Sequence, residues 1–83
     1  MVTVFRDGAL RFAIYSNDHE PVHVHVLTPD GSATLDLSGP DVRLDRVHGL
    51  SNRQARDALA MGRLRRDEFR SRWEDIHGPI RSR

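Results

Sequence analysis

Residues 10–37 read LRFAIYSNDHEPVHVHVLTPDGSATLDL, and this stretch decides the fold. Apolar side chains occupy every second position in three successive segments, and a period of two is typical of a strand with one buried face. A polar segment ending at Pro21 separates the first two segments, and the turn residues Pro29-Asp30-Gly31 separate the second from the third. We therefore expect three half-buried strands, whose apolar positions are Leu10, Phe12 and Ile14, then Val22, Val24 and Val26, then Ala33, Leu35 and Leu37.

Two further strands are expected on either side of this stretch. Val2 to Phe5 leads into Asp7-Gly8, which is a hairpin signal when strand-like residues flank it. After the turn residues 38–41, the segment from Val42 to Val47 alternates only weakly and is expected to form a short fifth strand. The first part of the chain thus predicts an antiparallel β-meander of four to five strands.

From Ser51 onward the apolar residues follow the period of a helix. Ser51 and Gln54 have the spacing of a capping box, which begins a helix, and Gly78-Pro79 ends it. At about 100° per residue the apolar side chains fall within a sector of roughly 100°, the width of a stripe that faces a core. The members of this stripe are Ala55, Ala58, Leu59, Gly62, Phe69, Trp73 and Ile76.

The predicted fold class is α+β, with the antiparallel meander packed against one long C-terminal helix. We expect a single domain over residues 1–83, with the sheet in residues 1–50 and the helix in residues 51–78. One helix from about Asn52 to His77 is the main prediction, and a break near Gly62 is the alternative. Gly62 lies on the stripe, where the lack of a side chain is expected to permit a close approach to the sheet.

Composition limits the classes of function. The chain has 83 residues and no cysteine, so disulfides and cysteine-based zinc sites are excluded, and a metal would need His and carboxylate ligands. No segment approaches the ~20 apolar residues that span a bilayer, and the N-terminus lacks a signal-peptide pattern, so we expect a cytoplasmic protein. Residues 1–50 hold four Arg and seven acidic residues, whereas residues 51–83 hold nine Arg and five acidic residues, which makes the C-terminal part basic.

The polar loop and the strand after it resemble a known family. The residues that carry the likeness are Gly8, Phe12, 14–19, Pro21 and 23–26, and the likeness continues through Asp36-Leu37 to Trp73 and residues 76–78. They resemble the signature of DUF4160, a family of small bacterial domains of unknown function. The resemblance implies a bacterial origin and a second small domain encoded nearby, and such pairs are sometimes classed as toxin and antitoxin modules.

A shorter likeness would predict an enzyme. Residues 21–27, PVHVHVL, are similar to the histidine-triad motif of nucleotide hydrolases, in which three histidines alternate with apolar residues. In one register Pro21 occupies the position of the motif's first histidine, and in the other Leu27 occupies the position of its last histidine. One histidine of the motif is therefore missing in either register. Only twenty-two residues precede His23, too few for the nucleotide-binding fold that those hydrolases place before the motif. Short motifs of this kind often arise by chance, and we set this class aside.

Three histidines and an aspartate are the candidate metal ligands. His23 and His25 are two positions apart on an expected strand, so they project from one face with Cα atoms about 6.6 Å apart. His19 or Asp18, returning from the loop, would supply a third ligand for a divalent metal such as zinc. The alternative is purely structural: Asp18 and His19 stabilise the turn, and His23 and His25 occupy the polar face of the sheet with hydrogen bonds across strands.

The helix offers a second candidate surface. Arg56, Arg63 and Arg70 recur every seven residues, so they are expected to lie in a row with ~10.5 Å between neighbours, with Arg66 at its edge. Such a row suits a protein partner or a phosphate backbone. The competing interpretation is a solvated face, with ion pairs four residues apart at Arg53 and Asp57, Arg63 and Asp67, Glu68 and Arg72, and Arg70 and Glu74. Acidic residues interrupt the basic segment, so nucleic acid is not the favoured partner.

Two functional hypotheses follow. The preferred one is a non-enzymatic binding module whose partner is a protein encoded nearby, as in a toxin–antitoxin pair, or a second copy of the chain. Its contact surface would be the arginine row or an uncovered edge of the sheet. The alternative is a metal-dependent hydrolase with His19, His23 and His25 as ligands and Asp18 as ligand or general base.

Overall fold

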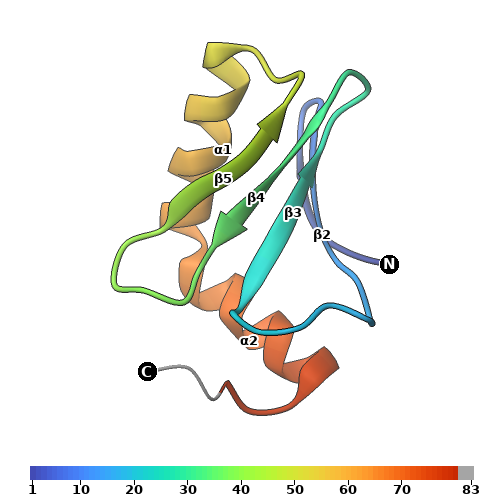
Figure 1. The fold of residues 1–83 in the computed structure, drawn as a ribbon, viewed down its shortest axis with the longest axis vertical. Helices are drawn as coiled ribbons and strands as arrows, with labels where there is room; N and C mark the ends of the chain where they lie inside the picture. Colours follow the sequence, from blue (N-terminus) through green and yellow to red (C-terminus); the bar gives the residue numbers. More distant parts are fainter. Residues whose placement is uncertain (81–83) are drawn as a thin grey trace.

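A computed structural model describes residues 1–80 of the chain (Figure 1). An antiparallel sheet of five strands is followed by two helices, which confirms the predicted α+β class and the meander, the fifth strand included. The strands lie in the sheet in chain order: β1 (Val2–Asp7), β2 (Leu10–Ile14), β3 (His23–Leu27), β4 (Ser32–Asp36) and β5 (Arg43–His48).

The first hairpin fixes the register of the sheet's N-terminal edge. Asp7 pairs with Leu10, which leaves Gly8 and Ala9 as a two-residue loop. Gly8 has a φ of 59°, a positive value of the kind that two-residue hairpin loops require and that glycine adopts without strain. The hairpin predicted at Asp7-Gly8 is therefore confirmed.

Apolar side chains of the strands and helices form one core between the sheet and the helices. Three phenylalanine rings, from β1, β2 and α2, pack together in this core. Their ring centroids are 5.9 Å apart for Phe5 and Phe12 and 5.3 Å apart for Phe12 and Phe69. Burial of each such side chain stabilises the fold by roughly 1.5–3 kcal/mol. The largest fully buried side chains are those of Trp73, Phe12, Phe69, Ile14, Leu35, Leu37, Val22, Val24 and Val26.

The C-terminal segment forms two helices, α1 (Asn52–Leu64) and α2 (Arg66–His77), so the prediction of one continuous helix is wrong. The predicted capping box begins α1, because the Ser51 hydroxyl accepts a hydrogen bond from the Gln54 N–H and the Gln54 side chain accepts one from the Ser51 N–H. The helices meet at Arg65, whose φ of −110° and ψ of 20° are not helical, and not at Gly62.

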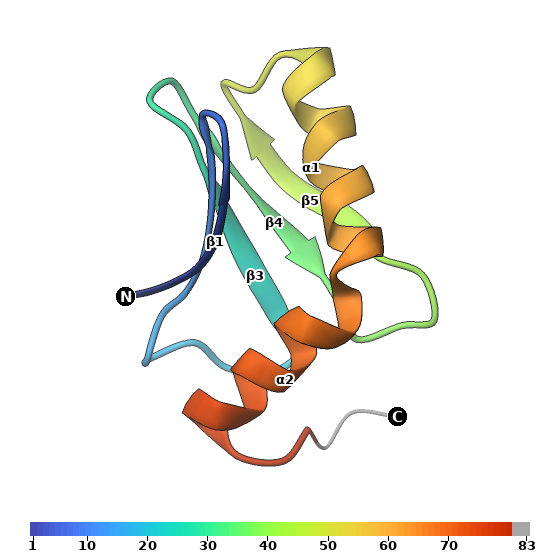
Figure 2. The same ribbon diagram turned by 180° about the vertical axis from the view of Figure 1, so that it is seen from behind.

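The break changes the direction of the helical segment. A straight helix over residues 52–77 would be about 39 Å long, and the domain with the broken helix has a longest extent of 33 Å. α1 runs along β5, and after the break α2 crosses toward the start of β3 (Figure 2). The turn brings Phe69 and Trp73 under the sheet, where they are 0% and 1% exposed.

Arginine contacts hold the two helices on either side of the break. The guanidinium of Arg65 lies 3.7 Å from the ring centroid of Phe5, a cation–π contact with β1. Arg66 donates a hydrogen bond of 2.6 Å to the Gly39 carbonyl, and Arg70 donates one to the Leu37 carbonyl. Both carbonyls lie in the loop between β4 and β5, so these side chains fasten the start of α2 to the sheet.

Both helices lie on one face of the sheet (Figure 2), and no described element covers the other face (Figure 1). This open face carries the polar residues of the alternation, among them His23, His25 and Thr34, which are each partly exposed. No helix within residues 1–80 has the length and apolar character needed to cross a membrane.

Gly62 confirms the predicted close approach of helix and sheet, and it gives a test. A Cβ atom at Gly62 would lie 2.7 Å from Leu35 Cδ1 and 3.2 Å from Val42 Cγ1, both in the core. Gly62→Leu is therefore expected to lower the free energy of unfolding by about 2–3 kcal/mol through overpacking. Ala60→Leu, on the exposed side of α1, is the matched control and should be nearly neutral. Urea denaturation measures both, and equal effects would contradict this packing.

Candidate functional site

The loop between β2 and β3 returns Asp18 to the open face of the sheet. The Asp18 N–H donates to the Tyr15 carbonyl at 3.1 Å, and the Tyr15 N–H donates to Asp18 Oδ2 at 2.9 Å. This pair of hydrogen bonds closes a tight turn at the end of β2 and fixes the direction of the carboxylate. The side chain of Asp18 is only 10% exposed.

Asp18 meets the two histidines that project from β3. His25 Nε2 lies 3.0 Å from Asp18 Oδ1 and 3.2 Å from Oδ2, and His23 Nε2 lies 3.5 Å from Oδ1. One ligand atom from each of the three residues lies within 4.8 Å of the others. The ring centroids of His23 and His25 are 5.0 Å apart, as expected for alternate positions of one strand face.

The hydrogen bonds around His23 leave one of its ring nitrogens turned toward Asp18. His23 Nδ1 lies 2.7 Å from the Pro21 carbonyl, which only accepts, so Nδ1 carries the proton of this bond. In a neutral ring Nε2 then presents a lone pair toward the Asp18 carboxylate. Two acceptors facing each other at 3.5 Å are favourable only when a cation or a second ring proton lies between them.

Aromatic contacts fix the two imidazole rings. Tyr15 stacks on His25 with centroids 4.4 Å apart, and Trp73 packs against His23 at 5.1 Å. His77, at the end of α2, lies 4.2 Å from Trp73, and its Nε2 is 3.1 Å from the Tyr15 carbonyl. The C-terminal end of α2 therefore contacts the His23 ring and the Tyr15 backbone, in addition to contributing Trp73 to the core.

The carboxyl of Asp18 is held in its charged form. Burial raises its pKa, but the hydrogen bonds from the Tyr15 N–H and from His25, together with the charges of His25 and His23, lower the pKa by more. The net result is a pKa below the ordinary value of 3.8. An ionised carboxylate beside two imidazoles is a suitable donor set for a divalent metal.

A pocket of about 400 Å³ opens beside the cluster on the same face. Its walls come from the loop that carries Asp18 and His19, and from Asp45 and Arg46 of β5. Arg46 has a φ of 53°, an uncommon conformation for a residue other than glycine, at a register shift between β4 and β5. The site thus has a cavity next to its candidate ligands, large enough for water and a small ligand.

Of the four predicted metal ligands, the structure brings together Asp18, His23 and His25. His19 is exposed and lines the same pocket, but it lies outside this group of three. The contacts of Trp73, His77 and Arg46 were not foreseen. Trp73 was expected in the core, where it lies, but nothing in the spacing of a helix stripe predicts its contact with a strand fifty residues earlier in the chain.

The predicted arginine row divides into two groups. Arg66 and Arg70 donate hydrogen bonds to backbone carbonyls of the loop between β4 and β5, whereas Arg56 and Arg63 are exposed and form no ion pair with residues 1–80. Among the predicted pairs four residues apart, only that of Arg53 and Asp57 is present, at 3.9 Å. The prediction of the other three pairs is wrong; the observed pairs near the break and in α2 are Arg65 with Glu68, Arg66 with Asp67 and Arg72 with Asp75.

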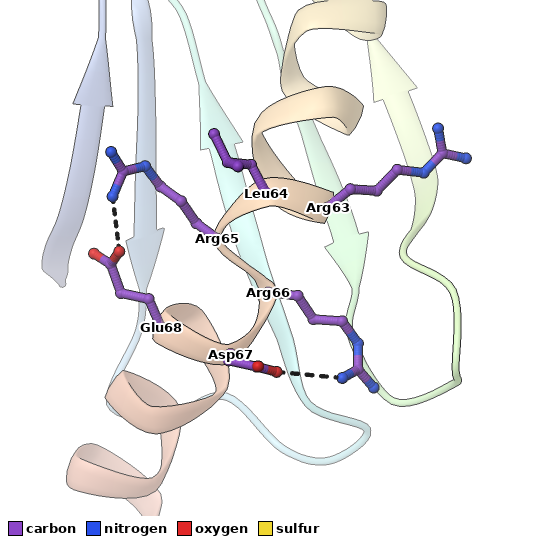
Figure 3. Close-up of a pocket in the computed structure, with 6 residues that line it drawn as sticks. All are labelled: Arg63, Leu64, Arg65, Arg66, Asp67 and Glu68. Carbon is purple, nitrogen blue, oxygen red and sulfur yellow. Dashed lines mark hydrogen bonds and ion pairs between the residues drawn. The ribbon is translucent and has the colours of Figure 1, made fainter.

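A second hollow lies at the helix break, with a volume of about 530 Å³ (Figure 3). Leu64 is 76% exposed there and is flanked in sequence by Arg63 and Arg65. Figure 3 shows Arg63 and Arg66 pointing to one side of the break and Arg65 to the other, where it pairs with Glu68. Leu64 is the most exposed large apolar side chain of residues 1–80, which makes it the candidate contact for another protein.

Fold and site together define a class: a small α+β domain with two histidines and an aspartate clustered on the open face of a five-stranded sheet. Residues 9–74 match the sequence profile of Domain of unknown function (DUF4160), and the chain belongs to this family. Comparison with curated proteins and with solved structures gave no significant match.

Replacement of Asp18 tests the electrostatics of the cluster. Because its pKa in the folded state is below 3.8, the ionised carboxylate stabilises the fold above that pH, and the contribution is lost as the pH falls through the folded-state pKa. Asp18→Asn should therefore be less stable than the parent near neutral pH, and the difference should shrink in acid. Urea denaturation across a pH series measures this.

The matched control for this series is Asp41→Asn, which alters an exposed carboxylate with no hydrogen bond or ion pair to residues 1–80. It should leave the pH dependence unchanged. A loss of stability in Asp18→Asn that is constant from neutral to acidic pH would contradict a charged carboxylate in the cluster.

Proposed function

We propose that this domain binds a divalent transition-metal ion such as zinc through Asp18, His23 and His25. The single observation that carries the proposal is the convergence of one carboxylate oxygen and two imidazole nitrogens from a loop and a strand. Two histidines and one carboxylate form a common donor set for metal sites that keep a coordination position free for water or substrate.

The distances between the donor atoms support this proposal. Ligands at about 2.0–2.1 Å from a tetrahedral zinc ion are about 3.3 Å from each other. The observed separations from Asp18 Oδ1 are 3.0 Å to His25 Nε2 and 3.5 Å to His23 Nε2. Two of the three separations are therefore close to those of ligands around one ion, and the third, between the two imidazole donors, is within 4.8 Å.

The groups behind the ligands also support it. The Pro21 carbonyl accepts from His23 Nδ1, which fixes the tautomer that presents Nε2, and the Tyr15 N–H orients the carboxylate. Such outer hydrogen bonds raise the basicity of metal ligands and set their direction. A zinc ion at this position would lower the pKa of a bound water to about 7, which is the chemistry of a hydrolase, and the adjoining pocket would admit a substrate.

Zinc binding gives a direct test. The parent should bind one zinc ion with a saturable change in the His23 and His25 ring signals in NMR, below millimolar metal. His25→Ala should weaken binding by about 100-fold or more, since even the loss of an outer partner of a ligand costs 10–100-fold. His19→Ala is the matched control, because His19 lines the pocket but is not in the cluster. Unchanged binding in His25→Ala, or an equal loss in His19→Ala, would contradict the proposal.

A second candidate function is the binding of a partner protein, and the exposed Leu64 at the helix break favours it. Arg56 and Arg63 lie on the same helix without ion pairs to residues 1–80, so a complementary partner would carry acidic residues around an apolar pocket. A protein encoded beside this chain, as in a toxin–antitoxin pair, would be the partner to test.

Co-expression with the proteins encoded on either side, followed by affinity purification, tests this second role. Leu64→Asp should abolish co-purification of the partner, because it places a carboxylate at the centre of the contact. His25→Ala should retain the partner, which separates this role from metal binding. Retention of the partner by Leu64→Asp would remove the helix break as the contact surface.

A further inference from the structure

Two arginines lie directly opposite each other in the first hairpin. Arg6 of β1 is the register partner of Arg11 of β2, next to the paired Asp7 and Leu10 that close the turn. Directly opposite residues on one face of an antiparallel pair have Cβ atoms about 4.5–5.5 Å apart. Phe12, the neighbour of Arg11, is buried in the core, so both arginines belong to the open face.

This pairing is unfavourable by itself. Like charges directly across two strands repel each other and destabilise the sheet. Within residues 1–80 neither Arg6 nor Arg11 forms an ion pair, although Asp7 lies at the end of β1 and Asp30 in the turn after β3. Arg6 is exposed and Arg11 is only partly exposed, so the second charge is in part withdrawn from water.

The arginines border a hollow of about 390 Å³. Its other walls are the hairpin loop at Gly8 and Ala9, the end of β3 at Leu27, and the turn residues Thr28 and Pro29. Leu27 is the register partner of Arg11, so an apolar side chain lies beside the guanidinium. The hollow thus has two unpaired cationic groups on one side and a partly apolar wall on the other.

We propose that Arg6 and Arg11 form a binding site for an anionic oxygen group, a phosphate or a carboxylate. Each guanidinium presents a planar fork of N–H donors that matches the oxygens of such a group. An anion between them would replace the repulsion of two cations by two attractive contacts. The site does not depend on a metal ion at Asp18, His23 and His25.

The arginine site lies on the same open face of the sheet as the pocket beside Asp18, His23 and His25. His25 is the register partner of Ala13, which follows Arg11 by two residues on the same strand face. The Cα atoms of Arg11 and His25 are therefore about 8 Å apart, from a step of two residues along one strand and one strand spacing across. The arginine hollow and the candidate metal ligands therefore lie on the same face of the sheet, one strand apart.

NMR titration of the full chain at low ionic strength tests the site. The probes are inorganic phosphate and acetate, each compared with chloride at equal ionic strength. Phosphate should produce saturable shifts of the Arg6 and Arg11 Nε–Hε signals, and Arg11→Gln should weaken this binding by about tenfold, the loss expected for one charge-assisted hydrogen bond. Saturation by acetate as well would assign an oxyanion site in general, and saturation by phosphate alone would assign a phosphate site.

Two further measurements keep the result separate from general charge effects. Without added anion, Arg11→Gln should raise the melting temperature at low salt, because it removes the repulsion, and Arg6→Gln should do the same. Arg53→Gln, which removes an arginine of α1 whose side chain is 85% exposed and lies outside the arginine row, should change neither the melting temperature nor phosphate binding. Shifts that are the same in phosphate and chloride, or that saturate at the same phosphate concentration in Arg11→Gln as in the parent, would overturn the proposal, whatever the outcome with zinc.

Discussion

Successive side chains of a β-strand point to opposite faces, and β3 depends on that constraint more than any other element. Val22, Val24 and Val26 are buried in the core, while His23 and His25, which alternate with them, are held on the open face. A shift of the register by one residue would bury both imidazoles and expose the valines. Burial of the valines fixes the register of β3 and so places both histidines on the open face. No other contact is needed to keep the histidines on that face.

The remaining parts of the site are held by contacts between distant segments. The turn at Tyr15 directs the Asp18 carboxylate to the histidines, and the end of α2 supports the same turn through His77 and the His23 ring through Trp73. These contacts exist only because the helical segment breaks at Arg65 and sends α2 across the sheet. The break thus connects the packing of the core to the geometry of the open face.

The sequence predicted those features that follow from local periodicity. Alternation identified the strands, and the capping box at Ser51 placed the start of α1. One continuous helix was the main prediction because the apolar stripe continues across Arg65 with helical spacing. The alternative of two helices was right in number but placed the break near Gly62, three residues too early. The roles of Arg66 and Arg70 were missed for a related reason, since helical spacing contains no information about carbonyls in the loop after β4.

For the candidate site, proximity in sequence was a good guide to Asp18 but not to His19. Both lie in the same short loop, and the Tyr15 hydrogen bonds turn Asp18 toward β3 while His19 remains outside the cluster. The central claim is that Asp18, His23 and His25 bind one metal ion, and X-ray absorption spectroscopy of the zinc-loaded chain tests it most directly. We predict two imidazole nitrogens and one carboxylate oxygen at about 2.0–2.2 Å, with one imidazole lost in His25→Ala. A spectrum with only water ligands, or one that His25→Ala leaves unchanged, would contradict the account.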